Sequence, residues 1–282
     1  MGARELPGEV TTLRFGTAGS VDDGKSTLIG RLLHDAKGLM EDQLAAVART
    51  TARQGAAEGE IDLSLFTDGL TAEREQGITI DVAWRYFATP RRRFIIADTP
   101  GHEQYTRNMV TGASTASLSI VLADAHRGLT TQSRRHAAIA SLLAIPHVVL
   151  AVNKMDLAGW DRGAFESIAA EFEGIARALG LPKVTAIPLS ALRGDMVVER
   201  GNNLDWYTGP TLLEALESAS PVDPVDDLRF PVQLVARSRF GPRADLRGYQ
   251  GRVETGSVAV GDTIVVHPAG VERSGEHTSE LQ

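Results

Sequence analysis

Residues 19–26 read Gly-Ser-Val-Asp-Asp-Gly-Lys-Ser, a glycine-framed loop that closes on lysine and serine. The apolar run 13–18 before it predicts a buried strand, and residues 25–33 after it predict a helix. In such a strand–loop–helix unit, backbone N–H groups and the helix N-terminus converge on one point and favour a phosphate. The Lys25 ammonium can bridge two phosphates, and the Ser26 hydroxyl can bind Mg²⁺. The stretch therefore predicts a nucleotide-binding α/β domain.

Two carboxylates, Asp22 and Asp23, lie inside this loop. We interpret them as solvated side chains at variable loop positions; the alternative is that they tune the affinity for metal or nucleotide. A chance match to a glycine-rich turn is disfavoured by the strand before the loop and the helix after it. The loop residues expected to contact the nucleotide are Gly19, Ser20, Val21, Asp22, Asp23, Gly24, Lys25, Ser26 and Thr27.

A second buried strand, residues 93–97, runs into Asp98-Thr99-Pro100-Gly101. The Asp98 carboxylate can hold a magnesium-bound water, and the Gly101 N–H can bond a γ-phosphate only while that phosphate exists. This dependence is the physical basis of a switch. An ordinary strand-to-loop turn is the alternative, because the same four residue types suit a turn. We expect Asp98, Thr99, Pro100 and Gly101 to bind the nucleotide.

A charged segment with one glycine, residues 73–80, precedes the strand predicted over 81–87. Such a loop is expected to become ordered only around its ligand. Within it, Thr79 is placed to complete the Mg²⁺ shell together with Ser26 and, through water, Asp98. The alternative is a surface loop with an ordinary threonine. Residues 35–77 as a whole are read as a helical, mobile insertion.

The base of the nucleotide is indicated by Asn153-Lys154-Met155-Asp156, which follows another buried strand. The Asp156 carboxylate can accept hydrogen bonds from guanine N1–H and the 2-amino group, donors that adenine does not offer together. The Lys154 stem can cover the base, and Asn153 is expected to tie this loop to residues 19–26. Ser190-Ala191-Leu192 follows the next strand, where the Ala191 N–H can reach guanine O6. The ligands predicted are therefore GTP and Mg²⁺.

The alternation of strand-like and helix-like runs predicts an α/β fold, a mostly parallel sheet with helices on both faces. Residues 81–87 and 93–97 are expected to form an antiparallel hairpin at the sheet edge. Further strands are expected over 118–122, 148–152 and 184–189, and helices over 132–143, 164–179 and 211–218.

The domain organisation is expected to change after residue 219. We predict a flexible tail (1–11), a GTP-binding domain (12–219), a Pro/Asp-rich linker (220–227) and a partial β-barrel domain (228–271) with strands over 230–235, 251–256 and 262–266. Residues 273–282 do not continue the barrel pattern and resemble the translation of a sequencing adaptor. We expect 272–282 to be a non-native scar and the natural chain to continue past about Val271.

The composition narrows the function classes further. Of 282 residues, 43% are hydrophobic and 23% charged, which suits a globular protein. Cysteine is absent, which excludes disulfides and thiolate catalysis and fits a cytoplasmic location. No apolar run is long enough to span a membrane. The net charge of −7 disfavours nucleic acid as a partner.

With these motifs in place, the chain resembles the translation-factor class of P-loop GTPases. Within that class it is most similar to the GTPase (large) subunits of bacterial sulfate adenylyltransferase. The likeness runs from about Leu13 to Val266, and its most specific segments are residues 19–34, 72–83, 96–109 and 206–214. The chain departs from that family by stopping inside the second domain.

The resemblance implies several properties. His102 is implied to be catalytic, because translational GTPases use a histidine there to orient the attacking water; a structural or solvated histidine is the alternative. A heterodimer with a small catalytic subunit is implied, in which GTP hydrolysis is coupled to formation of adenosine 5′-phosphosulfate and pyrophosphate from ATP and sulfate. The alternatives are an elongation-factor-like GTPase that binds aminoacyl-tRNA, and the N-terminal part of a bifunctional sulfate adenylyltransferase/adenylylsulfate kinase.

Overall fold

The computed structural model describes residues 11–36, 63, 81–219, 227–237 and 247–274. The chain divides into two compact units, residues 1–221 and 222–282. Within the described residues, no helix is both long and apolar enough to cross a bilayer. The predicted insertion over 35–77 falls almost wholly outside the described residues.

The first unit is built on a 6-stranded sheet whose order is β2-β3-β1-β4-β5-β6. All neighbours are parallel except β2, which runs antiparallel to β3 at the edge, so the predicted edge hairpin is confirmed. The strands are β1 (Thr12–Ala18), β2 (Ala83–Ala88), β3 (Arg93–Asp98), β4 (Leu118–Asp124), β5 (His147–Asn153) and β6 (Val184–Pro188).

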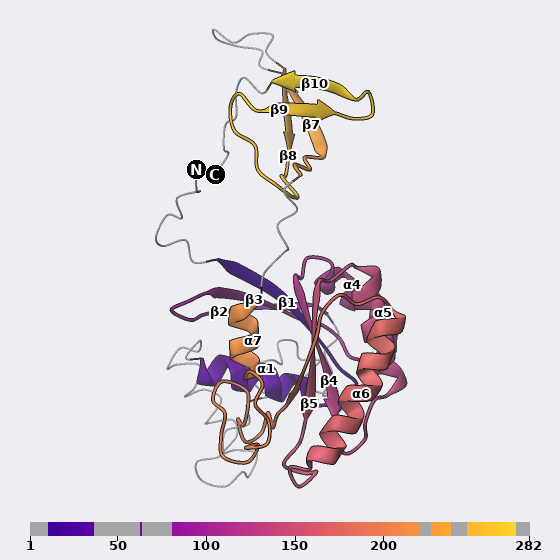
Figure 1. The fold of residues 1–282 in the computed structure, drawn as a ribbon, viewed down its shortest axis with the longest axis vertical. Coiled ribbons are helices and arrows are strands. Elements are labelled where there is room, and N and C mark those ends of the chain that lie inside the picture. The colour runs from indigo at the N-terminus through magenta and orange to yellow at the C-terminus, as the bar shows by residue number, and fades with distance from the viewer. Residues whose placement is uncertain (1–10, 37–62, 64–80, 220–226, 238–246, 275–282) are drawn as a thin grey trace. The chain divides into compact units, whose positions relative to one another are not determined.

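Helices cover both faces of this sheet, as the α/β prediction requires. Helices α1 and α7 lie on one face, and α4, α5 and α6 lie on the other (Figure 1). The helices are α1 (Lys25–Asp35), α4 (Thr106–Ala113), α5 (Thr131–Leu142), α6 (Arg162–Ala178) and α7 (Leu212–Ser218), with a 3₁₀ turn η2 (Glu103–Tyr105) before α4.

Local sequence explains where most helices begin. Thr130 and Thr211 each open a capping box at the start of α5 and α7, and Asp161 accepts two backbone N–H groups at the start of α6. Helix α4 has no such side-chain cap and only eight residues, and sequence analysis did not predict it. It forms because its inward side packs onto the sheet.

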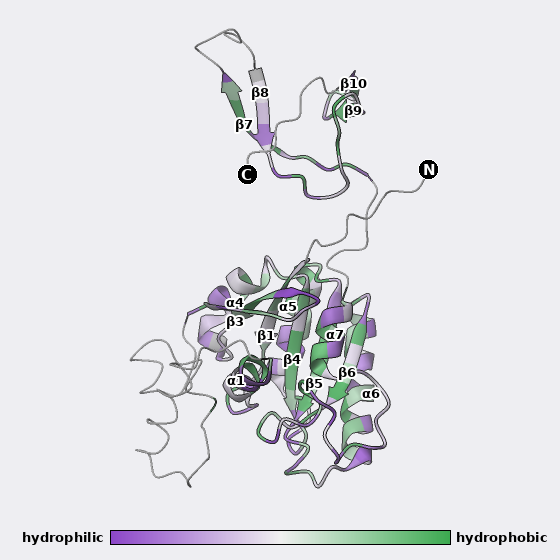
Figure 2. Ribbon diagram, turned by 90° about the vertical axis from the view of Figure 1, so that its left-hand side faces the viewer, coloured by the Kyte–Doolittle hydropathy of each residue, from purple (hydrophilic) through white to green (hydrophobic). Residues whose placement is uncertain are grey.

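The core lies along the two central strands. Every residue of β4 and β5 is buried, which is typical of parallel strands covered by helices on both faces. Figure 2 shows these two strands coloured mostly as hydrophobic. At the hairpin edge the Phe87 and Phe94 rings stack with centroids 4.5 Å apart. This rigid centre places the carboxyl ends of the parallel strands at one edge of the sheet.

The second unit contains two antiparallel pairs, β7 (Val232–Arg237) with β8 (Arg247–Gly251) and β9 (Thr263–Val266) with β10 (Val271–Ser274). Two expectations are corrected here. A strand was predicted over 251–256, but the observed strand β8 covers Arg247–Gly251 and ends where the predicted one begins. Gly256 has a left-handed φ of 69° that extended backbone does not adopt. Barrel closure remains a prediction.

The second correction concerns the tail. Arg273 and Ser274, expected outside the β pattern, pair with Ile264 and Thr263 across a turn that contains Gly270 at φ 65°. The glycine supplies the left-handed backbone of the turn, so the two strands meet. Residues 275–282 lie outside the described residues, and the scar remains a prediction.

One buried arginine anchors the end of the first unit. Arg92, at the hairpin turn, is 4% exposed, and its Nη1 donates to the carbonyls of Leu216 and Glu217 at 3.2 and 3.3 Å and also to that of Ala219. The last carbonyls of a helix have no partner within the helix. Arg92 therefore caps the C-terminus of α7.

We predict that Arg92→Met lowers the free energy of unfolding by about 2–3 kcal/mol, because several buried carbonyls lose their donor. Urea denaturation measures the change. The matched control is Arg91→Met: that side chain is 77% exposed, and its Nη1 lies 3.2 Å from Glu217 Oε2. It should cost below about 1 kcal/mol. Equal losses for the two variants would contradict the capping role.

Candidate functional site

The predicted site residues gather at the carboxyl edge of the sheet. Strands β1, β3, β4 and β5 are parallel and neighbouring, so the loops that follow them meet there. The loop 19–24 joins β1 to α1, Asp98 ends β3, and Asn153 ends β5. Motifs that are far apart in the sequence thus share one surface of the molecule.

The lysine of the loop meets the aspartate of β3. Lys25 Nζ lies 2.7 Å from Asp98 Oδ1, and the two side chains are 8% and 1% exposed. The other carboxylate oxygen, Asp98 Oδ2, is buried without a hydrogen-bond partner. Ser26 follows Lys25 on the first turn of α1 and is half-buried.

Two glycines are required by close backbone approach. A Cβ on Gly101 would lie 2.3 Å from the carbonyl oxygen of Gly19, so the loop after β3 rests directly on the first loop. A Cβ on Gly24 would lie 2.5 Å from Asn153 Nδ2, and its φ is 86°. No other residue type fits either place.

The Asn153 side chain joins three loops. Its Nδ2 donates to the Asp23 carbonyl at 2.8 Å, which confirms the expected tie to the first loop. Its Oδ1 accepts the Ala191 N–H at 2.9 Å. That N–H, which we expected to point at guanine O6, therefore has a protein acceptor in the structure. Because Asn153 is 1% exposed, both ends of its amide need partners.

The loops after β5 and β6 also orient Asp156. Ser190 Oγ donates to Asp156 Oδ1 at 2.7 Å and accepts the Arg193 N–H at 3.1 Å. Lys154, at a left-handed φ of 62°, places its Nζ 2.8 Å from Asp124 Oδ2. These contacts fix the Asp156 carboxylate and the Lys154 side chain, which come from the same loop after β5.

Among the other residues predicted to bind the nucleotide, some side chains are buried and others are exposed. Thr99 is buried, and its hydroxyl donates to the Thr17 carbonyl at 2.6 Å. Met155 is 0% exposed and lies in the core. Neither side chain is therefore exposed at the edge of the sheet where the site lies. Each was predicted to bind the ligand because it belongs to a short sequence motif, 98–101 or 153–156. In the structure, the backbone directs both side chains into the core. Pro100 is also buried, whereas Val21 and Leu192 are exposed.

His102 lies directly after Gly101. Its ring is half-buried, its Nδ1 accepts the Gln104 N–H at 3.3 Å, and its centroid is 6.1 Å from that of Tyr105. Its catalytic role, to orient the attacking water, remains a prediction. Thr79, the predicted magnesium ligand, lies outside the described residues.

Asp124 is a site residue that sequence analysis missed. Burial alone would raise its pKa, but the hydrogen bond from Lys154 and the N–H groups of His126 and Arg127 outweigh it, and the pKa is lowered. The detectable signal was a carboxylate at the end of an otherwise apolar run, residues 118–124. Its role in the structure is to hold Lys154.

The interpretation of the two loop carboxylates as solvated is right for one and wrong for the other. Asp22 is 70% exposed, 3.7 Å from Arg127. Asp23 is 0% exposed: its Oδ2 accepts the Ser20 N–H at 2.7 Å, and its Oδ1 is buried without a partner. The loop curls so that successive side chains point to opposite sides. Burial raises the pKa of Asp23 to about 6.

This shift gives a prediction for stability against pH. A carboxyl whose pKa is raised on folding favours the folded state below its unfolded pKa of 3.8, and that advantage disappears as the pH rises through about 6. We expect Asp23→Asn to gain about 2–3 kcal/mol relative to the parent protein between pH 4 and pH 7. Urea denaturation of both proteins across this range measures it. A difference that does not change with pH would contradict the assignment.

Comparison with known proteins agrees with this geometry. The family model described as the elongation factor Tu GTP binding domain matches residues 11–222. Sulfate adenylyltransferase subunit 1 of Methylorubrum extorquens (strain PA1) is 56% identical over 261 residues, which cover 92% of this chain and 55% of the relative. The bifunctional enzyme CysN/CysC of Mycobacterium tuberculosis (strain ATCC 25618 / H37Rv) is 59% identical over 262 residues, covering 92% and 42%. The chain spans about half the length of the curated relatives it matches.

Solved structures share the fold. The Ski7 GTPase-like domain of S. cerevisiae superposes with a TM-score of 0.64 at 19% identity, covering 90% of this chain and 60% of that one. The bacterial selenocysteine-specific elongation factor EF-Sec gives a TM-score of 0.53 at 25% identity, covering 94% and 38%. The family model covers most of the chain and all of the site described above, and we conclude that the chain belongs to the family of the elongation factor Tu GTP binding domain.

Proposed function

We propose that this chain is the GTP-binding part of a sulfate adenylyltransferase GTPase subunit. It would couple GTP hydrolysis to the formation of adenosine 5′-phosphosulfate and pyrophosphate from ATP and sulfate. The observation that carries the proposal is the 54–59% identity, over at least 92% of this chain, to proteins named sulfate adenylyltransferase subunit 1 or bifunctional enzymes CysN/CysC and NodQ. A separate small catalytic subunit as partner, and a cytoplasmic location, belong to the same proposal.

The assignment of the nucleotide contacts rests on where the motifs meet. The first loop and Lys25 would hold the phosphates, and the Gly101 N–H would contact the γ-phosphate. The backbone of Gly101 lies directly against that of Gly19, so the loop after β3 and the phosphate-binding loop are in contact. A movement of Gly101 on loss of the γ-phosphate would be transmitted to the neighbouring His102, so that hydrolysis would change the conformation of this loop.

The residues fit a magnesium ion. The Ser26 hydroxyl and, through water, the Asp98 carboxylate would hold it, with Thr79 as a further ligand. The buried Asp98 Oδ2 without a partner is a carboxylate oxygen of the kind that binds a metal-bound water. When bound, the ion would neutralise charge on the phosphates. Lys25, held 2.7 Å from Asp98, supplies the protein's own positive charge there.

Guanine selection would depend on Asp156, which Ser190 orients. We predict that Asp156→Asn reverses the hydrogen-bonding pattern and shifts base preference from guanine toward xanthine, with a loss of GDP affinity of at least about tenfold. Competition titrations with GDP and XDP measure this. Asp161→Asn is the control, because Asp161 caps α6 away from these contacts. Unchanged GDP affinity in Asp156→Asn would remove the assignment.

His102 would orient the attacking water. We predict that His102→Ala leaves the Kd for GTP within about twofold and lowers kcat for hydrolysis by about 10²-fold or more, in the range of a lost acid–base or orienting group. Single-turnover hydrolysis and nucleotide titration separate the two effects. Loss of nucleotide binding instead would mean that the half-buried ring has a structural role.

The decisive experiment is a GTP hydrolysis assay with and without the cognate small subunit, ATP and sulfate. We expect stimulation only when all three are present, and no stimulation by ribosomes. Ribosome-stimulated hydrolysis with aminoacyl-tRNA affinity would favour the elongation-factor alternative. A longer bifunctional protein is the other candidate, favoured by relatives named as bifunctional enzymes; the full length of the gene decides it.

A further inference from the structure

Arg31 reaches from the helix behind the phosphate-binding loop to the loop after β6. Its Nε donates to the Ala191 carbonyl at 3.1 Å, and its Nη2 donates to the Leu192 carbonyl at 2.6 Å. The two carbonyls belong to consecutive residues, so the planar guanidinium group binds one short segment of backbone through two of its nitrogens. The partners are 160 and 161 residues away in the sequence.

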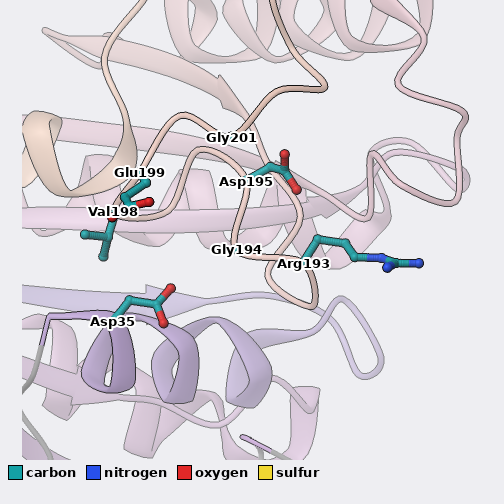
Figure 3. Close-up of a pocket in the computed structure, with 7 residues that line it drawn as sticks. All are labelled: Asp35, Arg193, Gly194, Asp195, Val198, Glu199 and Gly201. Carbon is teal, nitrogen blue, oxygen red and sulfur yellow. The ribbon is translucent and has the colours of Figure 1, made fainter. Parts of the chain in front are cut away.

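The guanidinium is held in place from its own helix. Arg31 Nη1 lies 3.5 Å from Asp35 Oδ1, one turn further along α1, and His34 Nδ1 lies 2.7 Å from the same oxygen. Figure 3 shows Asp35 on α1 facing the loop that carries Arg193, Gly194 and Asp195. A Cβ on Gly194 would lie 3.6 Å from Arg31 Cδ, so the stem of Arg31 also lies against this loop.

The loop that Arg31 grips is the one that arranges the base-recognition groups. Ser190, just before the gripped carbonyls, orients the Asp156 carboxylate, and the Ala191 N–H meets Asn153. Helix α1 begins at Lys25, the phosphate-binding lysine of the site. One rigid helix of 11 residues therefore links the phosphate end of the site to the base end.

We propose that Arg31 is a positioning residue for guanine: it fixes the backbone at 191–192 relative to the phosphate-binding loop, and thereby sets the fidelity of base selection. If Arg31 served only to form a surface ion pair with Asp35, its two hydrogen bonds to the carbonyls of Ala191 and Leu192 would have no role. The inference rests on the guanine-nucleotide binding proposed above and concerns the base end of that site only.

The test compares two nucleotides on the full chain. GDP offers O6, N1–H and the 2-amino group, whereas 2-aminopurine riboside 5′-diphosphate lacks the first two and keeps the same phosphates. Arg31→Met retains an unbranched stem and removes the donors. We expect the Kd for GDP to rise about tenfold, as for a lost charged hydrogen-bond donor, and the Kd for the 2-aminopurine nucleotide to change less than about twofold.

Two further variants control the result. Arg162→Met removes an arginine that also pairs with an acidic residue one turn along its helix, Glu166, and it should leave both affinities unchanged. Arg31→Lys keeps the charge and can reach one carbonyl at a time, so its selectivity should lie between those of the parent and Arg31→Met. If Arg31→Met unfolds below the assay temperature, the affinities of Arg31→Lys for the two nucleotides are compared with those of the parent protein instead.

Each outcome has a defined meaning. Equal weakening of both nucleotides in the Arg31 variants would indicate general damage to the domain and overturn the inference, as would unchanged selectivity. If the parent protein itself shows no preference for GDP over the 2-aminopurine nucleotide, the guanine site of the proposed function fails, and the Arg31 inference fails with it. If the parent protein prefers GDP and the Arg31 variants keep the same preference, the Arg31 inference fails while the proposed guanine site stands.

Discussion

The Asn153 side chain is the interaction on which the arrangement of the site depends. Its amide is almost wholly buried, so both ends must be paired, and the two partners come from the first loop and from the loop after β6. Since Gly24 has no Cβ, the amide can lie against the first loop. Three loops that are far apart in the chain are thereby fixed in one position relative to each other.

The same edge of the sheet carries groups that a purely structural core would avoid. Lys25 with Asp98, Lys154 with Asp124, and Asp23 with its unpartnered oxygen are all largely removed from water. Buried charges cost free energy unless their pairing is complete. The continuous apolar packing of β4 and β5 and their covering helices offsets that cost. Stability is thus supplied at the centre of the sheet, and the buried charges lie at the edge where the ligand is expected.

Much of the first unit was predictable, because period and spacing are local properties. The buried strands, the edge hairpin and the capped helices α5, α6 and α7 all carry signals within a few residues of one another. Helix α4 carries no cap and was missed, since only its contact with the sheet stabilises it. In the second unit, the ends of β8 and β10 depend on pairing partners and turn glycines that a linear pattern does not identify.

The sequence by itself determined the chemistry: which residue types are present, their order, and the α/β alternation that brings strand ends together. It did not determine which way each side chain points. Asp22 and Asp23 are adjacent and identical, yet one is solvated and the other is buried against Ser20. Likewise, the contacts of Arg31 and Asn153 join residues separated by 38 to 161 positions. Only tertiary packing decides such contacts, because burial and partner choice depend on the whole sheet and its helices, and local propensity carries no information about them.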